Sequence, residues 1–335
     1  MIDYFSPGVA IILTLVAASM WGSWMQVIKL LKKYPLSGLV FWLYTMSLII
    51  VCLATLLLRP ILLPDGIIVA SAGNFTTIIQ ILFGGAMMSL GMLVTLKIMG
   101  DIGLLLSTTM NGAVAALLGI LTAIWQEGLP EQPMAMPLIF GTTIMFVFAG
   151  FLCNSAAKMR DADRSQQSIA GEKAGQNGTV TLKTILMILL SVLLVNGWSH
   201  GTAVGTASGL PPILTALYMV IGSFVSVLIF SVIVFTKNKQ WRIVLCLGES
   251  KRPLVYSGIS AFCHYGGNLI AIYSMPVISA TFAFLFGRSS AVWTYFWGLY
   301  YGEFSNSKRK TWIVLSLGIL LFFAGVFLLG LFTLI

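Results

Sequence analysis

Arg288 and two histidines stand out because each lies within an apolar stretch of the sequence. An arginine at the centre of a membrane helix costs roughly 2.5–3.5 kcal/mol to insert, so Arg288 is expected to face a bundle interior or a water-filled cavity. There its guanidinium can donate two parallel hydrogen bonds to a carbonyl or hydroxyl group of a bound solute. The alternative is that Arg288 binds helix-end carbonyls or a buried carboxylate.

Four side chains are candidates for carrying a proton. An unperturbed histidine changes its charge near neutral pH, which makes His200 and His264 two of these candidates. Glu127 and Glu303 lie at the ends of apolar stretches, and no Asp or Glu lies deep within one. The histidines are therefore the stronger candidates for proton coupling, and a hydrogen bond to a neighbouring helix is the alternative role for each.

Aromatic rings and small polar groups recur in the same stretches and suit a sugar ring or a flat heterocycle. The aromatic candidates are Trp21, Trp24, Trp198, Tyr265 and Trp293, and the polar candidates are Ser23, Gln26, Thr108, Asn111, Asn196, Ser199 and Asn268. Helix packing is the alternative role for the rings. Trp297, Tyr300 and Tyr301 fit an interfacial aromatic belt better and are left out of the predicted site.

The elements that must hold these residues are membrane helices. The 335-residue chain is 58% hydrophobic and 9% charged, whereas a soluble domain carries about 25% charged residues. Runs of about 20 apolar residues are long enough to cross the bilayer. We place ten of them near residues 8–30, 37–58, 76–98, 102–125, 134–154, 184–208, 212–236, 254–275, 278–301 and 312–334.

The basic residues predict how these spans are oriented. With the N-terminus outside, the inside links carry seventeen of the nineteen Lys and Arg residues, the outside links carry Arg59, and Arg288 lies within a span. Basic residues gather in cytoplasmic loops. The net charge of +9 therefore reflects topology rather than nucleic-acid binding, and it places both termini outside in the plasma or inner membrane.

The chain divides into two similar halves. Residues 1–157 and 184–335 carry five expected spans each, and residues 158–183 form a polar cytoplasmic linker. At an offset of 176, Trp21-Gly22-Ser23-Trp24 falls on Gly197-Trp198-Ser199-His200, and Glu127 falls on Glu303. A half with five spans, an odd number, begins and ends on opposite sides of the membrane. The second half therefore begins on the side opposite to the first and is inverted relative to it. The predicted fold is an all-α membrane protein of ten transmembrane helices in two inverted five-helix repeats, the recurring architecture of secondary transporters.

Two short segments resemble the ureide permease family of ten-span transporters. They are Gly84-Gly85-Ala86-Met87-Met88-Ser89-Leu90-Gly91 and Tyr301-Gly302-Glu303-Phe304-Ser305-Asn306-Ser307-Lys308-Arg309-Lys310-Thr311. The order of spans and the long central loop also resemble the bacterial L-rhamnose–proton symporters. Both families belong to the drug/metabolite transporter (DMT) superfamily. The resemblance implies a proton-coupled importer of small, neutral, polar solutes.

Residues 197–201 also match the G-x-S-x-G motif of serine hydrolases. That motif requires a strand–turn–helix setting, whereas this segment is expected to be a membrane helix. An intramembrane hydrolase built on Ser199 and His264 is therefore the less favoured function. No catalytic residue is assigned. Gly197, Gly201, Gly205 and Gly209 form instead a ladder that suits close helix packing. No residue pattern has metal-ligand spacing and no phosphate-binding loop is present, so neither a metal nor a cofactor is expected.

The sequence therefore predicts a symporter of a monosaccharide, or secondly of a ureide or nucleobase, driven by protons. An exporter of metabolites or drugs and a passive facilitator share the same fold as alternatives. The expected partners are the solute, protons and membrane lipids, and a homodimer is compatible with this architecture; nucleic acid is not expected.

Overall fold

A computed structural model describes residues 5–31, 34–102, 134–167, 182–248, 250–278, 283, 286–287, 289–302 and 304–334. Throughout this part of the chain the backbone forms helices, turns and bends, without strands. Seven of the helices described are long and apolar enough to cross a membrane. Helices suit this setting because every backbone N–H and C=O inside lipid must find a partner within the protein. The prediction of an all-helical, multi-pass membrane protein is confirmed at this level.

The first half of the chain matches most of its expected spans. Its helices are α1 (Pro7–Ser23), the 3₁₀ turn η1 (Trp24–Gln26), α2 (Val27–Leu30), α3 (Leu36–Leu62), α4 (Ile67–Ser71), α5 (Phe75–Ile102) and α7 (Ala135–Gln167). The expected span 102–125 lies beyond α5, outside the described residues. Helix α7 continues to Gln167, well into the segment expected as a linker.

The second half contains one break that the sequence did not predict. Its helices are α8 (Leu182–Val195), α9 (Gly197–Ala207), α10 (Pro212–Lys237), α11 (Trp241–Val244), α12 (Arg252–Ile278), α14 (Ser290–Tyr300) and α15 (Arg309–Leu334). The sixth expected span is divided at Asn196 into α8 and α9. Helix α12 is long enough to span but is not one of the seven, because His264, Asn268 and its Ser and Gly residues lower its hydropathy.

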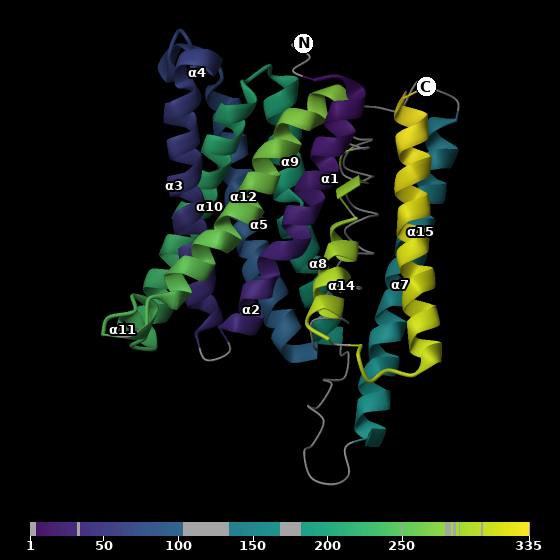
Figure 1. The fold of residues 1–335 in the computed structure, drawn as a ribbon. Helices are drawn as coiled ribbons and strands as arrows, with labels where there is room; N and C mark the ends of the chain where they lie inside the picture. The colour runs from purple at the N-terminus through teal and green to yellow at the C-terminus, as the bar shows by residue number, and fades with distance from the viewer. Residues whose placement is uncertain are drawn as a thin grey trace.

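The long helices stand side by side (Figure 1). Helix α12 packs against α1 and α3, α5 packs against α8, α9 and α10, and α7 packs against α15 at one side. Helix α1 begins and α15 ends at the same end of the bundle, whereas α2 and α11 lie at the other end (Figure 1).

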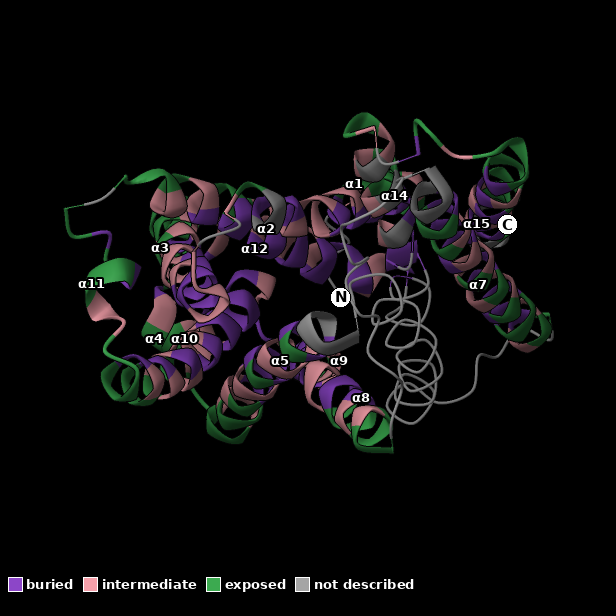
Figure 2. Cartoon of the chain, turned by 90° about the horizontal axis from the view of Figure 1, so that it is seen from below, coloured by how far each residue is buried: buried purple, intermediate pink, exposed green. Residues whose placement is uncertain are grey.

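Apolar side chains cover the outside of the bundle as well as its core. Leu57, Ile61 and Ile144 are 76%, 77% and 68% exposed, and Figure 2 shows exposed residues along the outer faces of the helices and buried residues between them. An apolar surface this extensive is unfavourable in water and is solvated by acyl chains in a bilayer.

Small residues let α5 approach its neighbours closely. A Cβ atom added to Gly84 would collide with the backbone of Gly197, and one added to Gly197 would collide with Gly84. Gly201 and Gly205 also face neighbouring side chains, which agrees with the packing role expected of the ladder. Gly209 is different, because it has a φ of +72° and forms the turn after α9.

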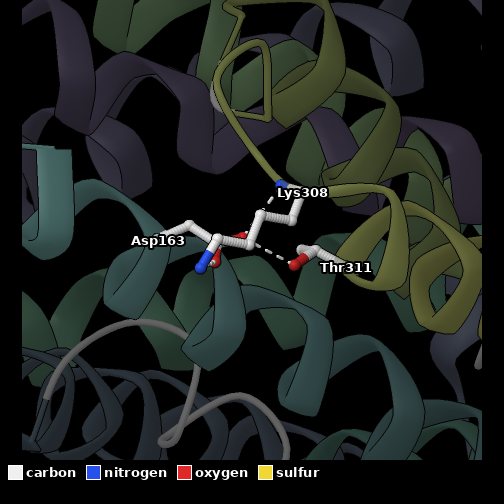
Figure 3. A network of polar contacts seen from close by, with 3 residues as sticks. All are labelled: Asp163, Lys308 and Thr311. Atoms are coloured by element: carbon white, nitrogen blue, oxygen red, sulfur yellow. Dashed lines mark hydrogen bonds and ion pairs between the residues drawn. The ribbon is translucent and has the colours of Figure 1, made fainter.

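The ends of α7 and α15 are joined by a polar cluster of Asp163, Lys308 and Thr311 (Figure 3). Asp163 Oδ2 accepts hydrogen bonds from the backbone N–H of Lys308 at 2.9 Å and from the Thr311 hydroxyl at 2.8 Å, while Lys308 Nζ lies 3.5 Å from Oδ1. The carboxylate thus caps the first turn of α15 from another helix. The pKa of Asp163 lies below its ordinary value, mainly because the carboxylate accepts the hydrogen bond from the Lys308 N–H. The Thr311 hydroxyl and the charge of Lys308 lower this pKa further.

Candidate functional site

Trp21, Trp198 and Asn268 meet where α1, α9 and α12 come together. The indole Nε1 of Trp21 donates a hydrogen bond to Asn268 Oδ1 at 2.9 Å. The rings of Trp21 and Trp198 lie edge to face with centroids 5.5 Å apart. Three residues that the sequence selected on three separate spans therefore lie next to one another.

A second group of rings surrounds His264, which lies one helical turn before Asn268 on α12. The imidazole centroid is 5.2 Å from the ring of Trp24, 5.9 Å from Tyr44 and 5.5 Å from Tyr265. Because His264 and Asn268 share a face of α12, the two groups form one continuous set. To these rings and amides we add Gln26, which is buried two residues after Trp24 in the same 3₁₀ turn. We call the whole set the central cluster: Trp21, Trp24, Gln26, Tyr44, Trp198, His264, Tyr265 and Asn268.

Several polar atoms of the central cluster are buried without a partner among the described residues. They are Gln26 Oε1, Tyr44 OH, Trp198 Nε1, Asn268 Nδ2 and both ring nitrogens of His264. Their residues are all at least nine-tenths buried. Nearly all buried polar atoms in native proteins have a hydrogen-bond partner, so this concentration indicates a place that binds water or a polar ligand.

The hydroxyl of Tyr265, which was expected to bind the solute, is bonded to a neighbouring helix instead. Its hydroxyl lies 2.9 Å from Ser223 Oγ, which is also 2.9 Å from the carbonyl oxygens of Gly85 and Met219. The single hydroxyl proton of Ser223 serves these carbonyls, so Tyr265 donates to Ser223. The phenol therefore ties α12 to α10 and α5, and only its ring borders the central cluster.

Ser23 is engaged in helix contacts. Its Oγ donates to the carbonyl of Ser19 and accepts a hydrogen bond from Trp297 Nε1, both at 2.7 Å. The bond from Trp297 ties α14 to α1, and the place of Trp297 in an interfacial belt stays a prediction. Its neighbour Tyr300 is 79% exposed, as a belt residue would be.

The remaining predicted residues that the structure describes are half-buried or exposed. Trp293 is 40% exposed, and its ring contact is with Phe296 of its own helix. Asn196, Ser199 and His200 are half-buried at the α8–α9 break. Within the described residues no hydrogen bond joins Ser199 to His264, whose ring neighbours are aromatic.

Five predicted residues lie outside the described part of the chain: Thr108, Asn111, Glu127, Arg288 and Glu303. Gly287, the residue before Arg288, is described and borders the central cluster. A Cβ added to Gly287 would lie 2.9 Å from Cζ3 of the Trp21 ring, so the residue before Arg288 lies against the central cluster.

Tyr44 is the cluster residue that sequence reasoning missed. It lies on α3 and is completely buried, with its ring against both His264 and Tyr265. The available signal was a tyrosine within a strongly aliphatic span, where its hydroxyl needs a partner. Sequence reasoning had looked for rings on other spans.

The chemistry of the described cluster is neutral and aromatic. Its side chains carry amide, indole, phenol and imidazole groups and include no Asp, Glu, Lys or Arg. Across the part of the chain that the structure describes, no three His, Cys, Asp or Glu residues gather as a metal site requires.

Comparison with family models and with curated protein sequences found no match for this chain. The case for a function therefore depends on the residues and geometry above.

Proposed function

We propose that the chain is a secondary active transporter that imports a small neutral polar solute by proton symport with alternating access. A monosaccharide is the first substrate class, and a ureide or nucleobase is the second. The observation that carries the proposal is the set of unpartnered polar atoms buried beside aromatic rings in the central cluster. Small-molecule sites combine apolar and aromatic contact with a few polar groups that fix orientation.

The helix bounds support two five-helix repeats. Shifted by 176 residues, α3 covers 212–238 beside α10 (Pro212–Lys237), and α5 covers 251–278 beside α12 (Arg252–Ile278). After the same shift α1 and α7 begin at 183 and 311, beside the observed 182 of α8 and 309 of α15.

The helix contacts and directions support the same repeat. Helix α12 packs against α1 and α3, as α5 packs against α8, α9 and α10. Helices α1 and α8 begin at opposite ends of the bundle (Figure 1), which is what an inverted repeat requires. Ten spans in two inverted repeats therefore remain our proposal for the complete fold.

The central cluster suits a solute that both donates and accepts hydrogen bonds. Trp198 Nε1 and Asn268 Nδ2 are donors, Gln26 Oε1 is an acceptor, and the Tyr44 hydroxyl can act as either. Sugar hydroxyls, and the N–H and C=O groups of ureides and nucleobases, offer the complementary pattern. The rings of Trp21, Trp24 and Trp198 would cover the solute's apolar face, and Arg288 would bind one of its polar groups.

Two interrupted helices supply a basis for alternating access. The α1 helix gives way to a 3₁₀ turn at Trp24, and the α8–α9 break falls at Asn196. Short 3₁₀ stretches within helices often mark hinges, and transporter sites are typically formed by discontinuous helices. Because Trp21 of the first half contacts Trp198 of the second, rocking one repeat against the other would open or close the cluster.

Proton coupling is assigned first to His264. A neutral imidazole offers one donor and one acceptor, whereas an imidazolium offers two donors. Protonation would therefore change the hydrogen-bond pattern presented to the solute, which links proton and solute binding. His200, Glu127 and Glu303 are the other candidates.

Uptake into proteoliposomes tests the proposal. We expect labelled monosaccharide, allantoin or uracil to accumulate only with an inward proton gradient, and to lose that accumulation in His264→Phe. Equilibration without accumulation would instead show a facilitator. Absence of uptake combined with efflux of preloaded solute from the vesicles would show an exporter.

A further inference from the structure

The segment between α10 and α12 is a fixed surface structure. Lys239 and Cys246 have φ values of +53° and +52°, and the N–H groups of Gln240 and Leu247 bond to the carbonyls of Phe235 and Arg242. These are six-to-one hydrogen bonds of Schellman type, which end α10 and α11.

Buried contacts hold this segment against the bundle. The carbonyl oxygen of Val244 accepts hydrogen bonds from Tyr34 OH and Trp42 Nε1, both at 2.7 Å. The Val244 side chain packs with Phe41 and Phe235. Burial, and then the neighbouring Cys246 thiol, raise the pKa of Tyr34, so its phenol remains a donor at neutral pH.

The outer face of the segment combines apolar and basic side chains. We call it the α11 surface: Lys237, Lys239, Arg242, Ile243, Leu245, Leu247, Lys251 and Arg252. Ile243, Leu245 and Leu247 are 41%, 37% and 55% exposed, and the five basic residues are exposed as well. Residues 237–252 contain a single acidic residue, Glu249, so the segment carries a net charge of +4.

The α11 surface projects sideways from the bundle at the level where α10 ends and α12 begins (Figures 1 and 2). The ends of membrane helices lie near the lipid headgroups. A segment with exposed apolar and basic side chains at this level meets the boundary between acyl chains and headgroups.

We propose that the α11 surface binds anionic phospholipid. Ile243, Leu245 and Leu247 enter the acyl boundary, and the basic side chains contact the phosphate groups. Charge complementarity selects anionic over zwitterionic lipid, because clustered Lys and Arg residues beside a membrane helix are attracted to negative headgroups. This inference depends on membrane insertion and is independent of the proposed transport.

Native mass spectrometry of the full-length protein, extracted from equimolar phosphatidylcholine and phosphatidylglycerol, tests the inference. We expect wild-type protein to retain phosphatidylglycerol preferentially, and Arg242→Gln/Lys251→Gln to lower that preference about tenfold. The matched control is Arg59→Gln/Lys97→Gln, which removes the same charge from two exposed positions outside any basic cluster and should keep the preference.

Three results would overturn the inference. They are the absence of a preference in the wild-type protein, an equal loss in the control pair, and a dimer peak that disappears only in the α11 variants. The last would identify a second copy of the chain as the occupant. Ile243→Ser/Leu247→Ser should weaken retention of phosphatidylglycerol, and unchanged retention would remove the apolar contact from the proposal.

Discussion

The central cluster and the Asp163 cluster both bury polar groups, but they satisfy them differently. Asp163 has a backbone N–H, a hydroxyl and an ammonium group around one carboxylate. The central cluster leaves atoms of Gln26, Tyr44, Trp198, His264 and Asn268 without partners among the described residues. A fully bonded polar group joins helices, whereas a buried unbonded one retains the capacity to bind something else. Removal of a bonded polar group, as in the Asp163 cluster, should change stability, and removal of an unpartnered group of the central cluster should change uptake.

The largest effect is expected from Arg288→Ala. If Arg288 binds the solute beside the central cluster, its removal should abolish uptake while the protein remains folded and inserted, because the charge is costly in the membrane and serves binding. Proteoliposome uptake and thermal unfolding measure the two properties. Normal uptake by this variant would remove Arg288 from the site.

Asn268→Ala should lower uptake by at least about tenfold, because it removes an unpartnered buried donor as well as the acceptor for Trp21. The matched control on the same helix is Ser274→Ala. Among the described residues, the Ser274 hydroxyl bonds to the carbonyl of Ile270, within its own helix. A solute titration of initial uptake rates would separate binding from turnover. If both variants transported equally well, the central cluster would not be the site.

Two buried tyrosines allow a finer comparison. Tyr44 and Tyr265 have ring centroids 6.2 Å apart, but only Tyr265 bonds its hydroxyl, to Ser223. We expect Tyr265→Phe to destabilise the protein by about 1 kcal/mol and leave uptake intact. Tyr44→Phe should lower uptake several-fold and leave stability unchanged. Chemical denaturation and uptake on both variants check this, and the reverse pattern would contradict it.

The smallest effect on uptake is expected from Asp163→Asn, which should lower the Tm by a few degrees without changing transport at room temperature. The control is Asp161→Asn, whose half-exposed carboxylate pairs with Arg160. A loss of uptake at an unchanged Tm would give Asp163 a functional role.

The stabilisation by Asp163 should also depend on pH. Its pKa is lower in the folded protein than in the unfolded chain, where it is about 3.9. The stabilisation by Asp163 is therefore complete above its unfolded-state pKa, and it is lost as the pH falls through the lower pKa of the folded state. The Tm difference between the wild-type protein and Asp163→Asn should be constant from pH 7 to about pH 5 and shrink only below about pH 4. A difference that disappears between pH 6 and 7 would point to another group.

Sequence reasoning succeeded where a single segment carries the information. The bounds of α3, α10 and α15 lie within a few residues of the expected spans, because the length of an apolar run sets the length of a membrane helix. It did not predict the break at Asn196 or the extension of α7 to Gln167. The break falls at Asn196-Gly197, a dipeptide that often marks a turn, so a local signal was present there and the apolar run around it was followed instead. The extension of α7 through Asp161, Asp163 and Gln167 has no comparable signal.

The residues of the central cluster were predicted in part. Trp21, Trp24, Trp198, His264 and Asn268 were selected because polar and aromatic groups are costly or conspicuous in an apolar span, and the structure brings them together. Residue type alone did not distinguish Tyr44 from Tyr265 or identify the bond between Ser23 and Trp297. In each case the deciding partner lies on another helix.

The sequence by itself determined that this chain forms apolar helices that cross a membrane, and it set where most of them begin and end. Those properties depend on hydropathy and length, which belong to each segment. Only the tertiary structure decided which polar atoms are bonded and which are left unpartnered. Trp21 and Asn268 are 247 residues apart in the chain but 2.9 Å apart in the fold, and hydrogen bonds form only within such distances.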